Sequence, residues 1–136
     1  MKLVFVNGCF DVLHCGHILL LKYARSLGDR LVVAIDSDAR VQFLKGACRP
    51  INRAEDRCLL LESIRYVDET RVFNTEQELV ELTALLQPDI MVVGSDYQNR
   101  KVIGAEHAKE TLFFDRIPHY STTQILEGSP LGRKLL

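Results

Sequence analysis

The sequence predicts a doubly wound α/β domain built on a five-stranded parallel sheet. Short apolar runs of strand length alternate about five times with segments of helical periodicity. The runs are apolar throughout and do not alternate with polar residues, which favours parallel strands covered on both faces. The connections are long enough for right-handed crossovers, so helices are expected on both faces of the sheet.

Length and composition fit one globular domain. At 136 residues we expect a single domain over 1–136, with its core at about 3–127 and a loosely held C-terminal tail at 128–136. Hydrophobic residues make up 47% and charged residues 26%, which is ordinary for a globular protein. A net charge of −1 gives no general footprint for nucleic acid or membranes, so small-molecule partners are expected.

The N-terminal apolar run is too short for a signal peptide, and no run approaches the length of a transmembrane helix. The sequence has no Cys-x-x-Cys pair among its four cysteines, Cys9, Cys15, Cys48 and Cys58. We therefore expect reduced thiols in a cytoplasmic protein.

The first half of the chain predicts a βαβ unit followed by two further helices. Gly28 is expected just past the end of the first helix, and Asn52 with Glu55 resembles a capping box for the third. The expected elements are a strand at 3–6, a helix at 18–27, a strand at 31–35, a helix at 39–44 capped from 36–38, and a helix at 53–66.

The second half repeats the alternation. Thr75 and Glu78 form a capping-box pattern for a helix that ends before Pro88, and Ser121 is a candidate cap for a last helix. The other expected elements are strands at 71–73, 90–93 and 111–114 and a short helix near 105–109.

Residues 8–17 join the first strand to the first helix and carry the main functional clue. In an open parallel sheet this junction lies at the carboxyl ends of the strands, where ligands bind and helix starts offer N–H groups to anions. His14 and His17 occupy neighbouring positions on one helical turn and can face one ligand. The alternative is that one histidine caps the helix while the other packs. Gly8 and Gly16 would let a phosphate approach the backbone.

Other phosphate and metal motifs fit less well. The chain lacks Gly-x-Gly-x-x-Gly after the first strand, and it lacks a Gly-x-x-x-x-Gly-Lys-Ser/Thr loop. Neither His107 nor His119 supplies a third zinc ligand at motif spacing. Phosphate binding therefore suits the histidine stretch better than metal binding.

Four segments occur in an order that carries a resemblance: Gly8-Cys9-Phe10-Asp11-x-x-His14-x-Gly16-His17, Lys45-Gly46-x-x-Arg49-Pro50-Ile51-Asn52 with Arg57, Gly94-x-Asp96-Tyr97, and Ser121-Thr122-Thr123. Together they resemble the cytidylyltransferase-like nucleotidyltransferases, which have a Rossmann-like fold, over residues 3 to about 127. Segments 49–52, 87–89, 94–97 and 102–106 are most similar to bacterial heptose 1-phosphate adenylyltransferases. Segment 65–69 and Arg116 are more similar to glycerol-3-phosphate cytidylyltransferases.

The resemblance implies transfer of a nucleoside monophosphate from ATP to a sugar 1-phosphate, with release of pyrophosphate. One alternative is a CTP:glycerol-3-phosphate cytidylyltransferase, and another is a catalytically inactive nucleotide-binding regulatory module. The implied partners are a nucleoside triphosphate, a small phosphorylated acceptor and a second copy of the chain in a homodimer. Mg²⁺ is expected with the triphosphate, held chiefly by phosphates and water and not directly by the protein.

The resemblance also implies roles for individual residues. The implied catalytic residues are His14 and His17, as donors to the triphosphate, and Lys45. The implied nucleotide-binding residues are Gly8, Cys9, Phe10, Gly16, Arg57, Gly94, Asp96, Ser121, Thr122 and Thr123. The implied acceptor-binding residues are Asp11, Arg49 and Arg116.

Plainer roles remain open for several of these residues. Lys45 can complement a helix dipole, Arg57 can be an exposed helix arginine, and a structural role bonding loop N–H groups is favoured for Asp11. The chain departs from the pattern at Cys9, where relatives often carry a hydroxyl, and at Val93, where heptose enzymes commonly carry a lysine.

Overall fold

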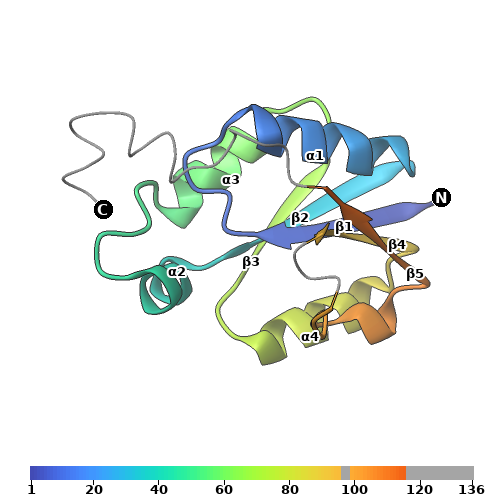
Figure 1. The fold of residues 1–136 in the computed structure, drawn as a ribbon. Coiled ribbons are helices and arrows are strands. Elements are labelled where there is room, and N and C mark those ends of the chain that lie inside the picture. The colour runs from blue at the N-terminus through green and yellow to red at the C-terminus, as the bar shows by residue number, and fades with distance from the viewer. Residues whose placement is uncertain (96–98, 116–136) are drawn as a thin grey trace.

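The computed structural model describes residues 1–95 and 99–115, which form a parallel sheet with helices on both faces (Figure 1). The strands are β1 (Leu3–Gly8), β2 (Arg30–Asp36), β3 (Glu69–Phe73), β4 (Ile90–Gly94) and β5 (Glu110–Phe114). The helices are α1 (Cys15–Ser26), α2 (Asp38–Lys45), α3 (Ala54–Glu62) and α4 (Glu76–Leu86), with a 3₁₀ turn η2 (Ala105–His107). The five strands lie in the order β3-β2-β1-β4-β5 and every neighbouring pair is parallel, which confirms the predicted fold class.

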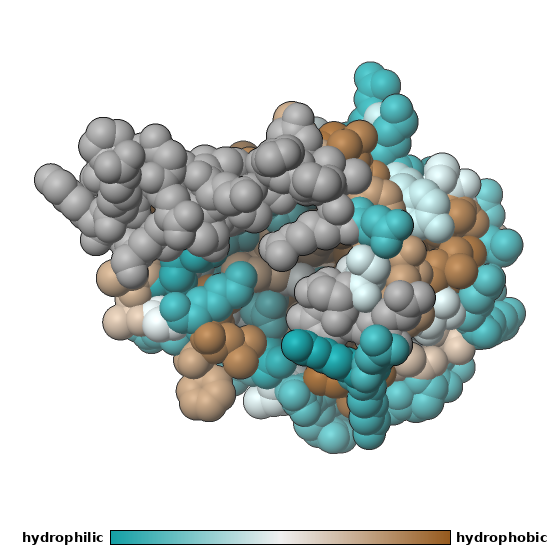
Figure 2. Space-filling model, in the orientation of Figure 1, coloured by the Kyte–Doolittle hydropathy of each residue, from teal (hydrophilic) through white to brown (hydrophobic). Residues whose placement is uncertain are grey.

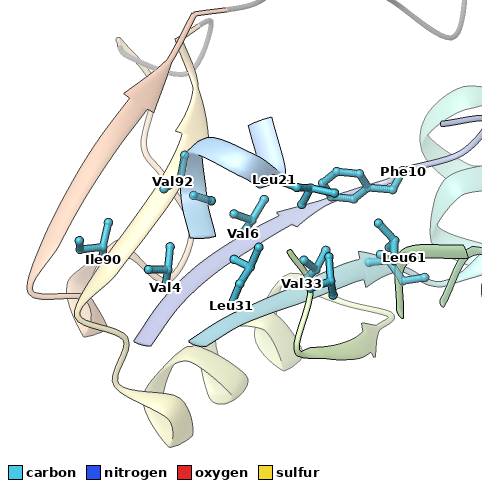
Figure 3. Close-up of a cluster of buried hydrophobic side chains, with 12 residues drawn as sticks. Val4, Val6, Phe10, Leu21, Leu31, Val33, Leu61, Ile90 and Val92 are labelled. Atoms are coloured by element: carbon cyan, nitrogen blue, oxygen red, sulfur yellow. The ribbon is translucent and has the colours of Figure 1, made fainter. Parts of the chain in front are cut away.

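The central strand β1 is buried on both faces, as its continuous apolar sequence predicts. On the face of α1 and α3, Val4 and Val6 pack with Leu21 and Leu61 (Figure 3). On the opposite face, Phe5 packs with Leu79 of α4. Each such side chain contributes roughly 1.5–3 kcal/mol when fully buried, so the sheet is a firm platform for the loops at its ends.

Local capping signals fix two of the helix starts where the sequence places them. The Ser37 hydroxyl accepts a hydrogen bond from Arg40 N at 3.1 Å, and the Thr75 hydroxyl accepts one from Glu78 N at 3.1 Å. The Glu78 carboxylate reaches the N–H of Asn74, one residue before the position a capping box would use. Helix α4 ends at Leu86, directly before Gln87 in the left-handed region and Pro88.

The start of α3 differs from the prediction. Asn52 does not cap this helix; the Asp38 carboxylate accepts a hydrogen bond from Ala54 N at 2.8 Å instead. A long-range carboxylate therefore replaces the local capping box. The helix also ends at Glu62, earlier than expected, because the chain then tightens into turns in which Ile64 N bonds Leu61 O at 3.0 Å.

Gly28 follows the end of α1 as expected, but it is needed for space and not for a left-handed conformation. A Cβ at this position would lie 2.7 Å from the carbonyl oxygen of Lys2. The short helix expected near 105–109 is a single 3₁₀ turn. The last predicted helix and the C-terminal tail lie outside the described residues.

Polar and apolar side chains are mixed on the visible face. Figure 2 shows hydrophilic side chains between separate apolar patches. The exposed apolar side chains include Phe43 of α2 and Leu85 of α4. Within residues 1–95 and 99–115, no helix combines the length and apolar character needed to cross a membrane.

Candidate active site at the carboxyl end of the sheet

The loop between β1 and α1 has an unusual backbone. Phe10 and Val12 have φ angles of 51° and 52°, in the left-handed region that residues with a Cβ rarely adopt. Such conformations cost of order 1–3 kcal/mol each and persist only where surrounding contacts hold them. We call residues 9–14 the histidine loop.

The two histidines form the N-terminal cap of α1 and stack on each other. Gly16 N donates to His14 Nδ1 at 3.1 Å, and His14 N donates to His17 Nδ1 at 3.1 Å. Their ring centroids lie 3.8 Å apart at an angle of 30°. Because both Nδ1 atoms accept hydrogen bonds, each neutral ring carries its proton on Nε2. Capping and ligand binding are therefore compatible. Each Nδ1 accepts a backbone hydrogen bond of the cap, and each Nε2–H is a donor that a ligand could use.

The cap also involves Gly16, whose place at the nucleotide stays a prediction. Its N–H is engaged by His14 and is not an open donor for a phosphate at the helix start. The alternative in which one histidine caps the helix is confirmed for His14, although a histidine at the N-cap is less common than Ser, Thr, Asp or Asn. His17 completes the cap by accepting from the N–H of His14, which that alternative did not include.

Gly8 and Phe10, whose predicted contact with the nucleotide stays a prediction, lie beneath His17 and support it. Phe10 is only 5% exposed and packs in the core beside Leu21 (Figure 3). Its ring centroid lies 5.3 Å from that of His17. A Cβ on Gly8 would lie 3.0 Å from the Phe10 ring, so this glycine makes room for the aromatic side chain.

Asp11 takes the structural role that the sequence favoured. Its carboxylate is fully buried and accepts hydrogen bonds from Ile51 N at 2.7 Å and Asn52 N at 2.9 Å. Arg49 Nε lies 3.3 Å from the same carboxylate. The Asp11 oxygens hold the 49–52 loop against the histidine loop. This arrangement does not present the carboxylate to an acceptor substrate, as the acceptor-binding prediction required.

Arg57 is neither an exposed helix arginine nor a phosphate contact in this structure. Its side chain is 0% exposed. Its Nη1 donates to the carbonyl oxygens of Cys9 at 2.9 Å and Asp36 at 2.8 Å. Its Nε donates to Asn52 O at 2.9 Å, and its Nη2 donates to the Asp38 carboxylate at 2.8 Å.

Lys45 is the last residue of α2 and is exposed. Burial raises the pKa of the Cys9 thiol, while the positive charges of Lys45 and Arg57 act in the opposite direction. The positive charge of Lys45 therefore acts on Cys9, a residue of the histidine loop. The raised pKa of Cys9 keeps this residue a protonated thiol at neutral pH, in line with an unreactive cysteine.

The strand order brings Gly94, at the end of β4, beside the end of β1. The chain runs outward from β1 in one direction to β2 and in the other to β4, and ligands of open α/β sheets bind at such a switch point.

Val93 packs in the apolar cluster on the α4 face. The other predicted residues, Asp96, Arg116, Ser121, Thr122 and Thr123, lie outside the described residues. Among those described, no group of three His, Cys, Asp or Glu could hold a metal ion.

Asp38 both caps α3 and pairs with Arg57, and its place in the sequence predicts neither contact. A signal for the burial of Arg57 was present. This residue lies three positions after Ala54, on the same helical stripe as Cys58 and Leu61, which faces the core.

Comparison with known proteins identifies the class. The bifunctional protein HldE of Helicobacter pylori (strain Shi470) is 48% identical over 126 residues, which cover 93% of this chain and 27% of that protein. The bifunctional protein HldE of Campylobacter concisus (strain 13826) is 44% identical over 126 residues, covering 93% and 26%. The chain thus spans about a quarter of the length of these curated relatives.

Solved structures show the same fold. A lipopolysaccharide core biosynthesis protein from Thermoplasma volcanium GSS1 matches with a TM-score of 0.67 and 30% identity, covering 89% of this chain and 99% of that one. A pantothenate synthetase from Thermus thermophilus has a TM-score of 0.67 at 19% identity, covering 98% and 64%, and this likeness shows the fold alone.

The fold and the histidine loop define a nucleotidyltransferase-like α/β domain. The family model for cytidylyltransferase-like proteins matches residues 5–127, and the chain belongs to this family.

Proposed function

We propose that this domain transfers the nucleoside monophosphate of ATP to a sugar 1-phosphate of the heptose 1-phosphate type. An acceptor phosphate oxygen attacks the α-phosphorus, the bond to the β-phosphate bridging oxygen breaks, and pyrophosphate leaves. The observation that carries the proposal is the stacked His14–His17 pair at the carboxyl end of β1, in a chain that belongs to this family.

In the proposed reaction no protein group forms a covalent bond with the substrates. Catalysis comes from alignment and from neutralising the charge that develops on phosphate oxygens. In the proposed reaction the Nε2–H groups of His14 and His17 donate to the triphosphate, and Lys45 supplies a mobile point charge from the end of α2.

Mg²⁺ would accompany the nucleotide. The described residues hold no metal cluster, so the chain offers no protein-only cage there and phosphates with water would supply most ligands. When bound, the ion screens the negative charge of the triphosphate.

Two findings support a sugar phosphate as the acceptor. The identity to bifunctional HldE proteins is 44–49% over most of the chain. One solved relative is named for lipopolysaccharide core biosynthesis. We further propose that the protein is cytoplasmic, because its four free cysteines fit a reducing compartment. We also propose a homodimer, on the analogy of the family. Sedimentation of the purified chain would test the dimer.

A pyrophosphate-release screen tests the proposed activity. ATP and CTP are each crossed with heptose 1-phosphate, other sugar 1-phosphates and glycerol 3-phosphate. We expect one pyrophosphate per nucleotide-linked sugar with ATP and the heptose. Turnover only with CTP and glycerol 3-phosphate would favour the cytidylyltransferase. Nucleotide binding without pyrophosphate from any pair would leave a binding module.

A further inference from the structure

One buried guanidinium joins four segments at the candidate site. Arg57 holds the histidine loop through Cys9 O and the end of β2 through Asp36 O. It holds the 49–52 loop through Asn52 O, and its bond to Asp38 fixes the first residue of α2. The same short helix ends at Lys45, so Arg57 connects both arms of the proposed phosphate site.

The contacts fall where the histidine loop needs support. Phe10, in its left-handed conformation, is flanked by Cys9, whose carbonyl accepts from Arg57, and by Asp11, whose carboxylate bonds the 49–52 loop. Buried partners on both sides hold a backbone that would otherwise relax. Since Phe10 also packs against the His17 ring, the backbone at residues 9–11 determines where that imidazole lies.

A lysine cannot reproduce this junction. Four hydrogen bonds leave Arg57 from three nitrogens of one planar group toward four different residues. A lysine ammonium keeps the charge but is a single point with three donors. The arginine's geometry, and not only its charge, matches the four segments.

We propose that Arg57 is a positioning residue, which holds the His14–His17 pair and the helix bearing Lys45 in one fixed arrangement and acts on the reaction only through them. The proposal rests on the proposed function for its kinetic consequences. It differs from a direct phosphate contact because the guanidinium is 0% exposed.

Arg57→Lys tests the proposal, and Arg53→Lys, at the exposed residue just before α3, is the matched control. For Arg57→Lys we expect kcat per folded molecule to fall about 10- to 100-fold, the scale of a small misplacement of reacting groups, while KM for ATP changes less than about three-fold. Unchanged kcat would overturn the proposal. If Arg57→Lys does not fold, Asp38→Ala removes the acceptor of one arm of the junction and is expected to lower kcat in the same direction.

A double-mutant cycle separates positioning from general damage. If Arg57 acts through His17, Arg57→Lys should cost little further activity in a His17→Gln background. Losses that multiply in full would show that Arg57 does not act through His17, and would contradict the proposed route from Arg57 through Phe10 to His17.

A measurement without substrate separates this proposal from the proposed function. In the wild type, nitrogen NMR should report both Nδ1 atoms unprotonated and accepting hydrogen bonds. Arg57→Lys should shift the ring nitrogen signals of His14 and His17, and Arg53→Lys should leave them in place. Unmoved signals would refute positioning even in an active enzyme. Shifted signals in a protein that releases no pyrophosphate would refute the activity alone.

Discussion

Carboxylates hold both ends of the sheet, but they do so in different surroundings. At the amino end, carboxylates accept hydrogen bonds from backbone N–H groups at the strand starts: Asp29 from Lys2 at 2.7 Å, Asp89 from Leu3 at 2.7 Å and Asp68 from Leu31 at 2.8 Å. The side chains of Asp68 and Asp89 are 38% and 23% exposed. At the carboxyl end, the Asp11 side chain is 0% exposed, and the half-exposed Asp38 carboxylate pairs with an Arg57 side chain that is also 0% exposed.

The same bond therefore has a different consequence at each end. Water can replace a partner at the amino end, so losing one bond there costs little. At the carboxyl end, removal of one partner leaves a buried charge or donor without compensation. The carboxylates at the amino end join strands, and those at the carboxyl end fix the shape of the histidine loop, which carries His14 and leads into the helix that bears His17.

Asp11→Asn should show this contrast most strongly. The amide keeps the shape of the side chain but loses the charge facing Arg49 and places an NH₂ group against backbone donors. Breaking a buried charged contact costs about 3–5 kcal/mol, and we expect a loss of that size in urea unfolding. Asp29→Asn at the amino end is the control, with an expected loss below about 1 kcal/mol. Equal losses of unfolding free energy in the two variants would contradict the stated difference between the buried and the exposed carboxylates.

His17 should affect turnover more than stability. We expect His17→Ala to lower the rate of pyrophosphate release at least ~10²-fold, the scale of one lost oxyanion-type donor. His17→Gln should be equally slow but more stable than His17→Ala, because glutamine can still accept the His14 N–H as in a capping box. His107→Ala, on η2, controls for loss of a histidine. Near-normal turnover in His17→Gln would remove this imidazole from the proposed chemistry.

The amino end should account for part of the acid sensitivity. The N–H of Leu3, and then Lys109, lower the pKa of Asp89. A carboxyl whose pKa is lower in the folded state contributes stability above its unfolded pKa, and this is lost as pH falls through the folded pKa. We expect Asp89→Asn to be less stable than the wild type at neutral pH, with the gap in Tm closing as the pH falls. A gap that stayed constant would contradict this role of Asp89.

Cysteine labelling should give the smallest effect. Burial raises the pKa of Cys9, whereas Cys15 and Cys48 are exposed. An alkylating reagent at neutral pH should modify Cys15 and Cys48 first, as peptide mass spectrometry would show. Labelling of Cys9 ahead of these two would mean that the histidine loop opens.

Periodicity was sufficient to predict the sheet, because parallel strands buried on both faces leave continuous apolar runs such as β1 and β2. The helix caps at Ser37 and Thr75 could also be predicted from the sequence, because the donor and the acceptor of each cap lie three residues apart. The failures are long-range. Asp38 caps α3 from another helix, and Arg57 finds its acceptors only after four segments have come together.

At the site, motif resemblance selected His14, His17 and the segment around Asp11, but it could not separate residues that touch a ligand from residues that hold those contacts. Burial makes that distinction for Phe10, Asp11 and Arg57. Helical spacing places Arg57 on the stripe of Cys58 and Leu61, but only the assembled fold shows which four acceptors its guanidinium meets.

The central place of β1 has a consequence for how the molecule assembles. Its pairing with β2 joins neighbours along the chain, whereas its pairing with β4 must close a much longer loop. The histidine loop and its buried supports all fall within residues 9–57, on the early-closing side. We therefore expect the histidine loop and its buried supports to become ordered first during synthesis, with β4 docking later against the free edge of β1 and β5 following it.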